Sequence, residues 1–94
     1  MVAQIWNHSQ WIKCTNKEAL KNIFPDMLKG AGFKILGYIE HDFKPQGFTA
    51  LWLLGESHFA IHTFPEYGKT YIEISSCNLQ YYERFLNLIK DIEQ

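Results

Sequence analysis

Three apolar segments in the second half of the chain give the strongest indication of the fold: FTALWLL at residues 48–54, HFAIHTF at 58–64 and KTYIEISS at 69–76. Each has the length, the β-branched and aromatic content and the apolar character of a strand. Gly55-Glu56-Ser57 breaks the pattern between the first two, and Pro65-Glu66-Tyr67-Gly68 separates the last two. Proline and glycine together indicate a tight turn. We therefore predict that segments 58–64 and 69–76 form an antiparallel hairpin.

Two further strands are expected upstream of these segments. Residues 33–41 form an apolar segment, and residues 42–47 after it contain the turn formers proline and glycine. This arrangement predicts a second hairpin, in which 33–41 pairs with 48–54. Near the amino terminus, residues 3–13 alternate loosely between apolar and polar side chains, which is typical of a half-buried strand.

A helix is predicted between the first two strands. Thr15 or Asn16 can cap a helix that begins at Lys17 and carries apolar residues at helical spacing. Pro25 lies inside this pattern, and we expect it to kink or divide the helix, because proline lacks the N–H of the helical hydrogen bond.

The element order predicts the fold class. Gly30 and Gly32 are expected to end the first helix, and residues 79–92 show the apolar spacing of an amphipathic helix. The resulting order, β-α-β-β-β-α, predicts a single domain over residues 1–94, an α+β two-layer sandwich with two helices on one face of an antiparallel sheet. The other face is either solvated or covered by a partner.

Length, composition and charge exclude several classes of protein. The chain has 94 residues, 47% of them hydrophobic and 20% charged, with a net charge of −1. It is too short for two lobes around a cleft and too apolar for a disordered protein. Its scattered lysines form no basic patch for nucleic acid. Because a domain of this size buries a limited core, dimerisation would help its stability.

Localisation and redox state follow from what the sequence lacks. No apolar run is long enough to span a bilayer, and the amino terminus does not resemble a secretory signal. We therefore expect a cytoplasmic protein without a membrane segment. Cys14 and Cys77 are predicted to be free thiols, since neither has metal-ligand spacing around it.

The last hairpin brings reactive residues together. If its turn is centred on Tyr67, Ser57 lies opposite Cys77 at the open end. His62 lies about 16 Å from Ser57 along the strand and on the opposite face, so a second copy would have to supply this histidine to the same site. His58 and His62 would be about 13 Å apart on a strand, which is too far for a shared metal ion, and no metal site is predicted.

The segment GESHFAIHTFPEYG, residues 55–68, resembles the self-cleavage region of the prokaryotic S-adenosylmethionine decarboxylase proenzymes. Cys77 falls at the spacing found in that family. The preceding stretch Phe43-x-Pro-x-Gly-x-Thr49 is similar to the family's Phe-x-Pro-x-Gly-Val-Ser. The specific resemblance covers residues 41–78, with a similar element order from residue 3 to 40.

The resemblance implies self-cleavage between Glu56 and Ser57. The Ser57 hydroxyl would attack the Glu56 carbonyl to give an ester, and Thr49 would hydrogen-bond the developing oxyanion. His62 would then remove the Ser57 α-proton, so that elimination and hydrolysis leave a pyruvoyl group at residue 57. This self-derived pyruvoyl group would be the cofactor.

The same resemblance implies the reaction and the binding site. The amine of S-adenosylmethionine would form a Schiff base with the pyruvoyl group, and Cys77 would return a proton after carbon dioxide leaves, as a step toward spermidine. Phe43 would stack on adenine, Glu66 would bind the ribose, and Phe59 would line the pocket. Family sites are composite in a homodimer: one protomer supplies the pyruvoyl group and Cys77, and the other supplies His62 and Glu66.

Several positions differ from the family pattern and leave two alternatives open. Thr49 stands in place of a serine, Phe64 in place of a tryptophan, and Thr15 in place of an aspartate, while the first strand lacks the family's histidine and acidic residues. The first alternative is a pyruvoyl-dependent decarboxylase of arginine or ornithine, prompted by this strand and by Phe48. The second is an uncleaved, non-catalytic homologue that binds a nucleoside or a partner chain, prompted by the end of the sequence at Gln94.

Overall fold

The computed structural model describes residues 3–94, which form one antiparallel sheet and two α-helices. The elements are β1 (Trp6–Ile12), α1 (Lys17–Ala31), β2 (Ile35–Asp42), β3 (Phe48–Leu54), β4 (Ser57–Phe64), a 3₁₀ turn (Pro65–Tyr67), β5 (Lys69–Ser76), α2 (Leu79–Leu88) and a final 3₁₀ turn (Ile89–Asp91). The predicted order β-α-β-β-β-α is confirmed.

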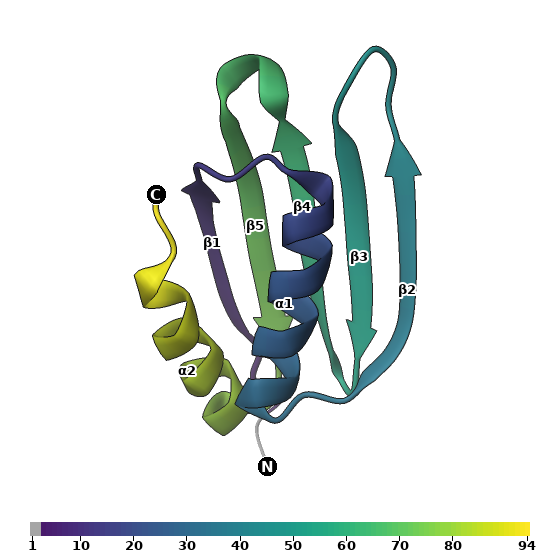
Figure 1. Cartoon of the computed structure of the whole chain (residues 1–94). Coiled ribbons are helices and arrows are strands. Elements are labelled where there is room, and N and C mark those ends of the chain that lie inside the picture. Colours follow the sequence, from purple (N-terminus) through teal and green to yellow (C-terminus); the bar gives the residue numbers. More distant parts are fainter. Residues whose placement is uncertain (1–2) are drawn as a thin grey trace.

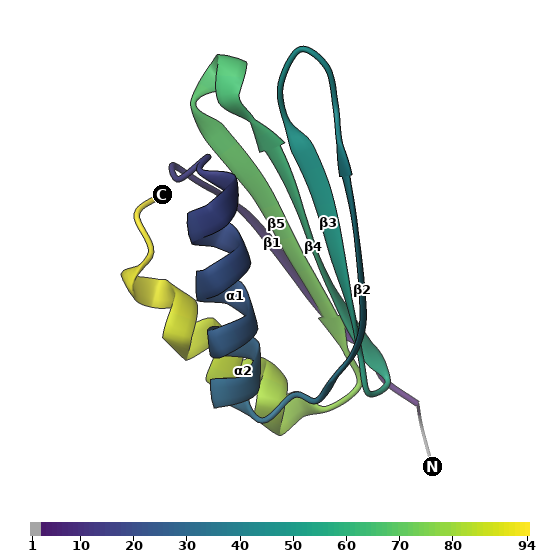
Figure 2. The same ribbon diagram turned by 45° about the vertical axis from the view of Figure 1, so that its right-hand side comes forward.

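The sheet has the strand order β1-β5-β4-β3-β2, and each neighbouring pair is antiparallel. Both predicted hairpins are present, and β1 adds to the outer edge of β5. Figure 1 shows α1 in front of the sheet and running along its strands, with α2 beside it on the side of β1, and the turned view in Figure 2 shows both helices on the same side of the sheet. The α+β two-layer prediction is therefore confirmed, and among residues 3–94 no element covers the second face of the sheet, called the open face below.

The core lies between the helices and the sheet. Phe59 of β4 is fully buried at its centre, with its ring centroid 4.9 Å from that of Phe24 on α1 and 5.2 Å from that of Phe85 on α2. Trp52 of β3 packs on the same ring. Aromatic pairs at these separations stabilise a core beyond their buried area. One strand residue thus holds both helices in place.

Pro25 does not divide α1, which runs as one helix from Lys17 to Ala31. A proline inside a helix costs about 3 kcal/mol, because it removes one hydrogen bond and crowds the preceding turn. Phe24 and Leu28 lie on either side of it and are fully buried against the sheet. Tertiary packing of this apolar face offsets the local cost.

Both ends of α1 follow the local sequence. The Asn16 side chain caps the first turn by accepting a hydrogen bond from the Ala19 N–H at 2.9 Å. Gly30 remains within the helix, whereas Gly32 ends it with a φ of 112°. A Cβ atom at position 32 would lie 2.7 Å from Cε1 of Tyr81, so both the backbone and the contact with α2 require glycine.

The register of the β4–β5 hairpin differs from the prediction by one residue. Phe64 pairs with Lys69, so that Ser57 pairs with Ser76 and not with Cys77. The reason is the turn, in which all four residues from Pro65 to Gly68 lie outside the ladder and Gly68 adopts a φ of 66°. The centre of the turn therefore lies between Glu66 and Tyr67, half a residue before the expected centre at Tyr67.

Candidate active site

Residues predicted to bind substrate line a pocket at one end of the sheet. The loop between β2 and β3 and the turn between β4 and β5 lie at this end (Figure 1). The pocket has a volume of about 350 Å³, which is in the range of small-molecule sites. Its lining residues are Phe43, Gln46, Gly47, Thr49, His62, Thr63, Phe64 and Glu66. We call it the end pocket.

Two of the predicted catalytic residues are in contact in the end pocket. Thr49 and His62 are paired across β3 and β4, and Thr49 Oγ1 lies within hydrogen-bond distance, 2.8 Å, of His62 Nδ1. Because Thr49 occupies Nδ1, Nε2 is the ring nitrogen left for exchange of a proton with a bound molecule. The contact also fixes the plane of the imidazole ring.

An aromatic ring and a carboxylate also line the end pocket. The Phe43 ring is about half exposed and packs edge-on against His41, with the centroids 4.7 Å apart. Glu66 is exposed on the turn between β4 and β5. An exposed aromatic face can stack on a planar base, and a carboxylate can accept hydrogen bonds from hydroxyl groups. The end pocket therefore has the chemistry expected of a nucleoside site.

The predicted cleavage site lies at the opposite end of the sheet. Gly55 and Glu56 form the tight turn between β3 and β4, and Glu56 adopts a φ of 54°, a left-handed conformation that is unfavourable for a residue with a side chain. Ser57 follows at the first position of β4 and is 7% exposed. The Ser57 hydroxyl donates a hydrogen bond to Oγ of Ser76 at 2.8 Å.

Cys77 lies beside the same peptide bond despite the changed register. Its Sγ is 3.2 Å from the main-chain oxygen of Glu56 and 3.2 Å from Oε2 of the Glu56 side chain. A hydrogen bond to the Glu56 carboxylate raises the pKa of the Cys77 thiol, and burial adds to this effect. The thiol can therefore stay protonated, and its single hydrogen can be shared between the carboxylate and the oxygen of the carbonyl group whose carbon Ser57 would attack.

Two predicted contacts are not found within one chain. Thr49 pairs with His62 and lies five positions before Leu54, the last residue of β3 before the cleavage turn. This separation is about 16 Å along a strand, so Thr49 does not reach the Glu56 carbonyl of its own chain. Phe59 does not line a pocket, because its side chain lies in the core with no exposed surface. Phe59 is buried because it occupies one of the alternating positions of β4 whose side chains point toward the helices.

Ser76 was not among the residues predicted to form the site. Ile72, Ile74 and Ser76 alternate with more exposed residues along β5, so this serine faces the helices with the core. The alternation along β5 indicates that Ser76 faces the core. Its pairing with Ser57 was missed because the predicted centre of the turn was wrong by half a residue.

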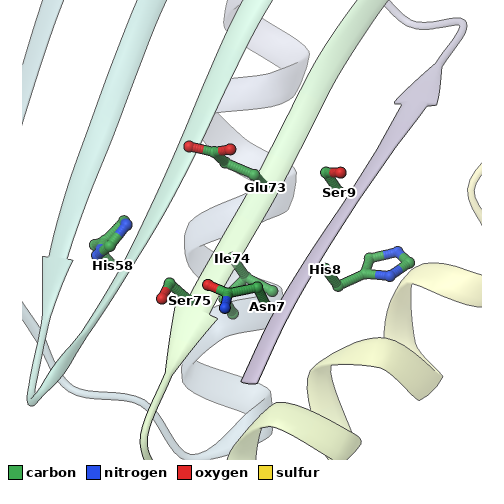
Figure 3. Close-up of a pocket in the computed structure, with 7 residues that line it drawn as sticks. All are labelled: Asn7, His8, Ser9, His58, Glu73, Ile74 and Ser75. Carbon is green, nitrogen blue, oxygen red and sulfur yellow. The ribbon is translucent and has the colours of Figure 1, made fainter. Parts of the chain in front are cut away.

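A second pocket opens between β1, β5 and β4 and contains none of the predicted site residues. Figure 3 shows its lining side chains, with His58 and Glu73 on neighbouring strands. Its volume is about 170 Å³, and its residues are Asn7, His8, Ser9, His58, Glu73, Ile74 and Ser75. In residues 3–94, no three His, Cys, Asp or Glu side chains gather as the ligands of a metal ion would. Nor does any helix there have the length and apolarity needed to cross a membrane.

Known proteins that resemble this chain belong to one family. The chain is 40% identical over 68 residues to an S-adenosylmethionine decarboxylase proenzyme of Prochlorococcus marinus (strain MIT 9313), covering 72% of this chain and 54% of that protein. It is 30% identical over 77 residues to the proenzyme of Shouchella clausii (strain KSM-K16), covering 82% of this chain and 59% of that one. The chain thus spans about half the length of the curated relatives it matches.

A solved structure shares the fold. The crystal structure of the adenosylmethionine decarboxylase from Aquifex aeolicus VF5 matches with a TM-score of 0.74 at 21% sequence identity, over 90% of this chain and 75% of that one. The family model described as S-adenosylmethionine decarboxylase matches residues 3–92. Because that match spans nearly the whole chain, the protein belongs to the S-adenosylmethionine decarboxylase family.

Proposed function

We propose that this protein cleaves itself between Glu56 and Ser57 and then decarboxylates S-adenosylmethionine, using a pyruvoyl group derived from Ser57. One observation carries the proposal: the 56–57 peptide bond lies in a strained turn between a buried serine hydroxyl and a protonated thiol. The names of the relatives, which are S-adenosylmethionine decarboxylase proenzymes, support both the cleavage and the substrate.

Self-cleavage begins with attack by Ser57. The bond between its Oγ and the Glu56 carbonyl carbon forms, the carbon–nitrogen bond breaks, and the hydroxyl proton passes to the released nitrogen, giving an ester. The Cys77 thiol, 3.2 Å from the Glu56 oxygen, stabilises the negative charge on that oxygen. Thr49, to which the resemblance assigns this role, does not reach the oxygen within its own chain, so Cys77 is the hydrogen-bond donor that one chain supplies. The left-handed backbone of Glu56 adds strain that cleavage releases.

The next step requires a base that the same chain does not bring to Ser57. His62 is on the open face in the end pocket, whereas Ser57 faces the helices at the other end of β4. We therefore propose a homodimer in which His62 of a second copy removes the Ser57 α-proton. The electrons form a carbon–carbon double bond, the Glu56 carboxylate leaves, and hydrolysis yields the pyruvoyl group and ammonia.

The open face is the surface proposed for this dimer. It carries Ile39, Leu51 and Leu53 on β2 and β3, which are exposed by 68%, 41% and 57%. In a twofold dimer, the end of one sheet that carries His62 would meet the end of the partner's sheet that carries Ser57. The symmetry repeats this contact, so two composite sites would form. Burial of these apolar side chains would stabilise the dimer.

In the mature protein, the pyruvoyl carbonyl would withdraw electrons as carbon dioxide leaves the substrate. The residues of this chain fit that group, because position 57 is buried at the start of β4 and Cys77 lies beside the peptide bond that precedes it. Phe43 would stack on adenine and Glu66 would bind the ribose hydroxyls in the end pocket. Cys77, protonated, would return a proton to the α-carbon.

Intact-mass analysis under denaturing conditions tests the proposal. We expect two fragments, residues 1–56 and 57–94, with the second carrying the mass of an amino-terminal pyruvoyl group in place of serine. Ser57→Ala should give one uncleaved chain, because no nucleophile remains. The cleaved protein should release carbon dioxide from carboxyl-labelled S-adenosylmethionine.

Two results would overturn this proposal separately. A wild-type chain that stays intact would exclude self-cleavage. A cleaved chain that decarboxylates arginine or ornithine, but not S-adenosylmethionine, would retain the cofactor and exclude the substrate.

A further inference from the structure

We propose that Ser76 is a positioning residue for self-cleavage, which holds the Ser57 hydroxyl through a buried hydrogen bond while Ser57 attacks the Glu56 carbonyl. This inference rests on the proposed self-cleavage and assigns a role to a residue outside the sequence-predicted site. Ser76 acts on Ser57 alone and takes no part in the exchange of bonds.

Burial and register make this contact specific. Ser57 and Ser76 are directly paired across β4 and β5, and their Oγ atoms are 2.8 Å apart. The two residues are 7% and 1% exposed, so water competes poorly for either hydroxyl. Buried hydroxyl groups need a partner, and each of these two provides one for the other.

The remaining hydrogen bonds of Ser76 set the direction of this contact. Ser76 Oγ accepts a hydrogen bond from the Asn78 N–H at 2.9 Å and donates one to the Asn78 carbonyl at 3.3 Å. A hydroxyl has one hydrogen and two lone pairs. Since its hydrogen and one lone pair are engaged by Asn78, Ser76 offers Ser57 an acceptor.

Ser57 must therefore donate its hydrogen to Ser76, which leaves its own lone pairs for the carbonyl carbon. The arrangement fixes the χ1 angle and the hydroxyl rotor of the nucleophile before attack. Asn78 anchors Ser76 in turn, because it caps α2 through its side chain, which accepts from the Tyr81 N–H at 3.0 Å. The nucleophile is thus tied to a rigid helix end, and such preorganisation accelerates an intramolecular reaction.

The test compares self-cleavage rates of pulse-labelled full-length chains made by cell-free translation. We expect Ser76→Ala to cleave at least about tenfold more slowly than wild type, because the nucleophile loses its fixed orientation. Ser76→Thr keeps the hydroxyl and should cleave within about threefold of wild type. Ser76→Cys fills similar space with a weak acceptor and should also be slowed, which keeps the test valid if the alanine variant does not fold.

Thr70→Val is the matched control. Thr70 lies on the same strand and face, is fully buried, and donates a hydrogen bond of 2.7 Å to the Cys14 carbonyl, but it pairs with Thr63 at the far end of β4. Its loss should lower the urea midpoint of unfolding and leave the cleavage rate within about threefold of wild type.

Three outcomes would overturn the role of Ser76: wild-type cleavage in Ser76→Ala, equal slowing in Ser76→Thr, or equal slowing in Thr70→Val. The proposed function fails differently, because in that case wild type itself does not cleave. Cleavage of wild type but not of Ser57→Ala, together with normal cleavage of Ser76→Ala, would therefore reject only this inference.

Discussion

Glu56 combines an unfavourable backbone conformation with a charge that acts on Cys77. Its φ is 54°, and its side-chain oxygen lies 3.2 Å from the thiol sulfur. A carboxylate accepts a hydrogen bond from a protonated thiol but repels a thiolate, so it raises the pKa of Cys77. The same residue thus supplies the scissile carbonyl and helps to keep the thiol in the form that can donate to it.

Removing the Glu56 charge should lower the pKa of Cys77. We expect Glu56→Gln to shift the pH midpoint of iodoacetamide alkylation of Cys77 to lower pH. Only the thiolate reacts with iodoacetamide, and in this variant the thiolate forms more readily because no carboxylate lies beside it. The measurement uses a Ser57→Ala, Cys14→Ala background, in which the chain stays intact and Cys77 is the single cysteine. An unchanged midpoint in this background would mean that the Glu56 contact does not control the thiol.

Ion pairs join helix α1 to strand β2 near the end pocket. Glu40 of β2 contacts both Lys17 and Lys21 at 2.7 Å, and Lys17 also contacts Asp42 at 2.8 Å. Hydrogen bonds from Lys17 and then Lys21 lower the pKa of Glu40 from 4.5 to about 2. These contacts hold the end of β2, from which the loop with Phe43 continues into the pocket.

The Glu40 contacts should stabilise the fold in a pH-dependent way. Because the pKa of Glu40 is lowered on folding, its contribution is complete above 4.5 and is lost as pH falls toward about 2. Glu40→Gln should therefore reduce the urea midpoint of unfolding at neutral pH, with a smaller difference from wild type at pH about 3. Glu83→Gln is the control, since Glu83 is exposed on α2 and forms no ion pair with residues 3–94. Equal differences at both pH values would contradict this prediction.

Elements also show where sequence reasoning succeeds and where it fails. The bounds of β3 and β5 match the prediction, since their apolar alternation ends at a clear turn. The pairing of β4 with β5 was wrong by one residue, because a change of half a residue in the turn moves every pair. Pro25 was expected to kink or divide the helix, and it does not divide it, because local propensity does not include the burial of Phe24 and Leu28.

For the whole molecule, the decisive feature is the separation of the two halves of the proposed site. The end pocket with His62 lies at one end of the sheet, and Ser57 with Cys77 lies at the other. An eight-residue strand, β4, sets this separation, and strands are too stiff to fold back. We therefore predict that two chains form each complete site.

Complementation tests this conclusion. Ser57→Ala lacks the nucleophile but keeps His62, and His62→Ala has the opposite defect, so neither should form a pyruvoyl group alone. In an equal mixture refolded together, about half of the His62→Ala chains pair with a Ser57→Ala chain and should mature. Mass spectrometry detects the fragment 57–94 with its pyruvoyl group, and sedimentation confirms dimers. Failure of the mixture to mature, despite mixed dimers, would show that His62 does not act across the interface.

Local sequence was sufficient to predict the strands, the ends of the first helix, the fold class and the family resemblance. Each of these depends on neighbours along the chain or on a motif of fixed spacing, as with the Asn16 cap and the segment from residue 55 to 68. Which side chains are in contact became clear from the three-dimensional structure. It placed Phe59 in the core, Thr49 on His62, and Ser76 rather than Cys77 opposite Ser57. These contacts depend on turn geometry and on packing between distant segments, and a shift of one residue reverses the face of every side chain in a strand.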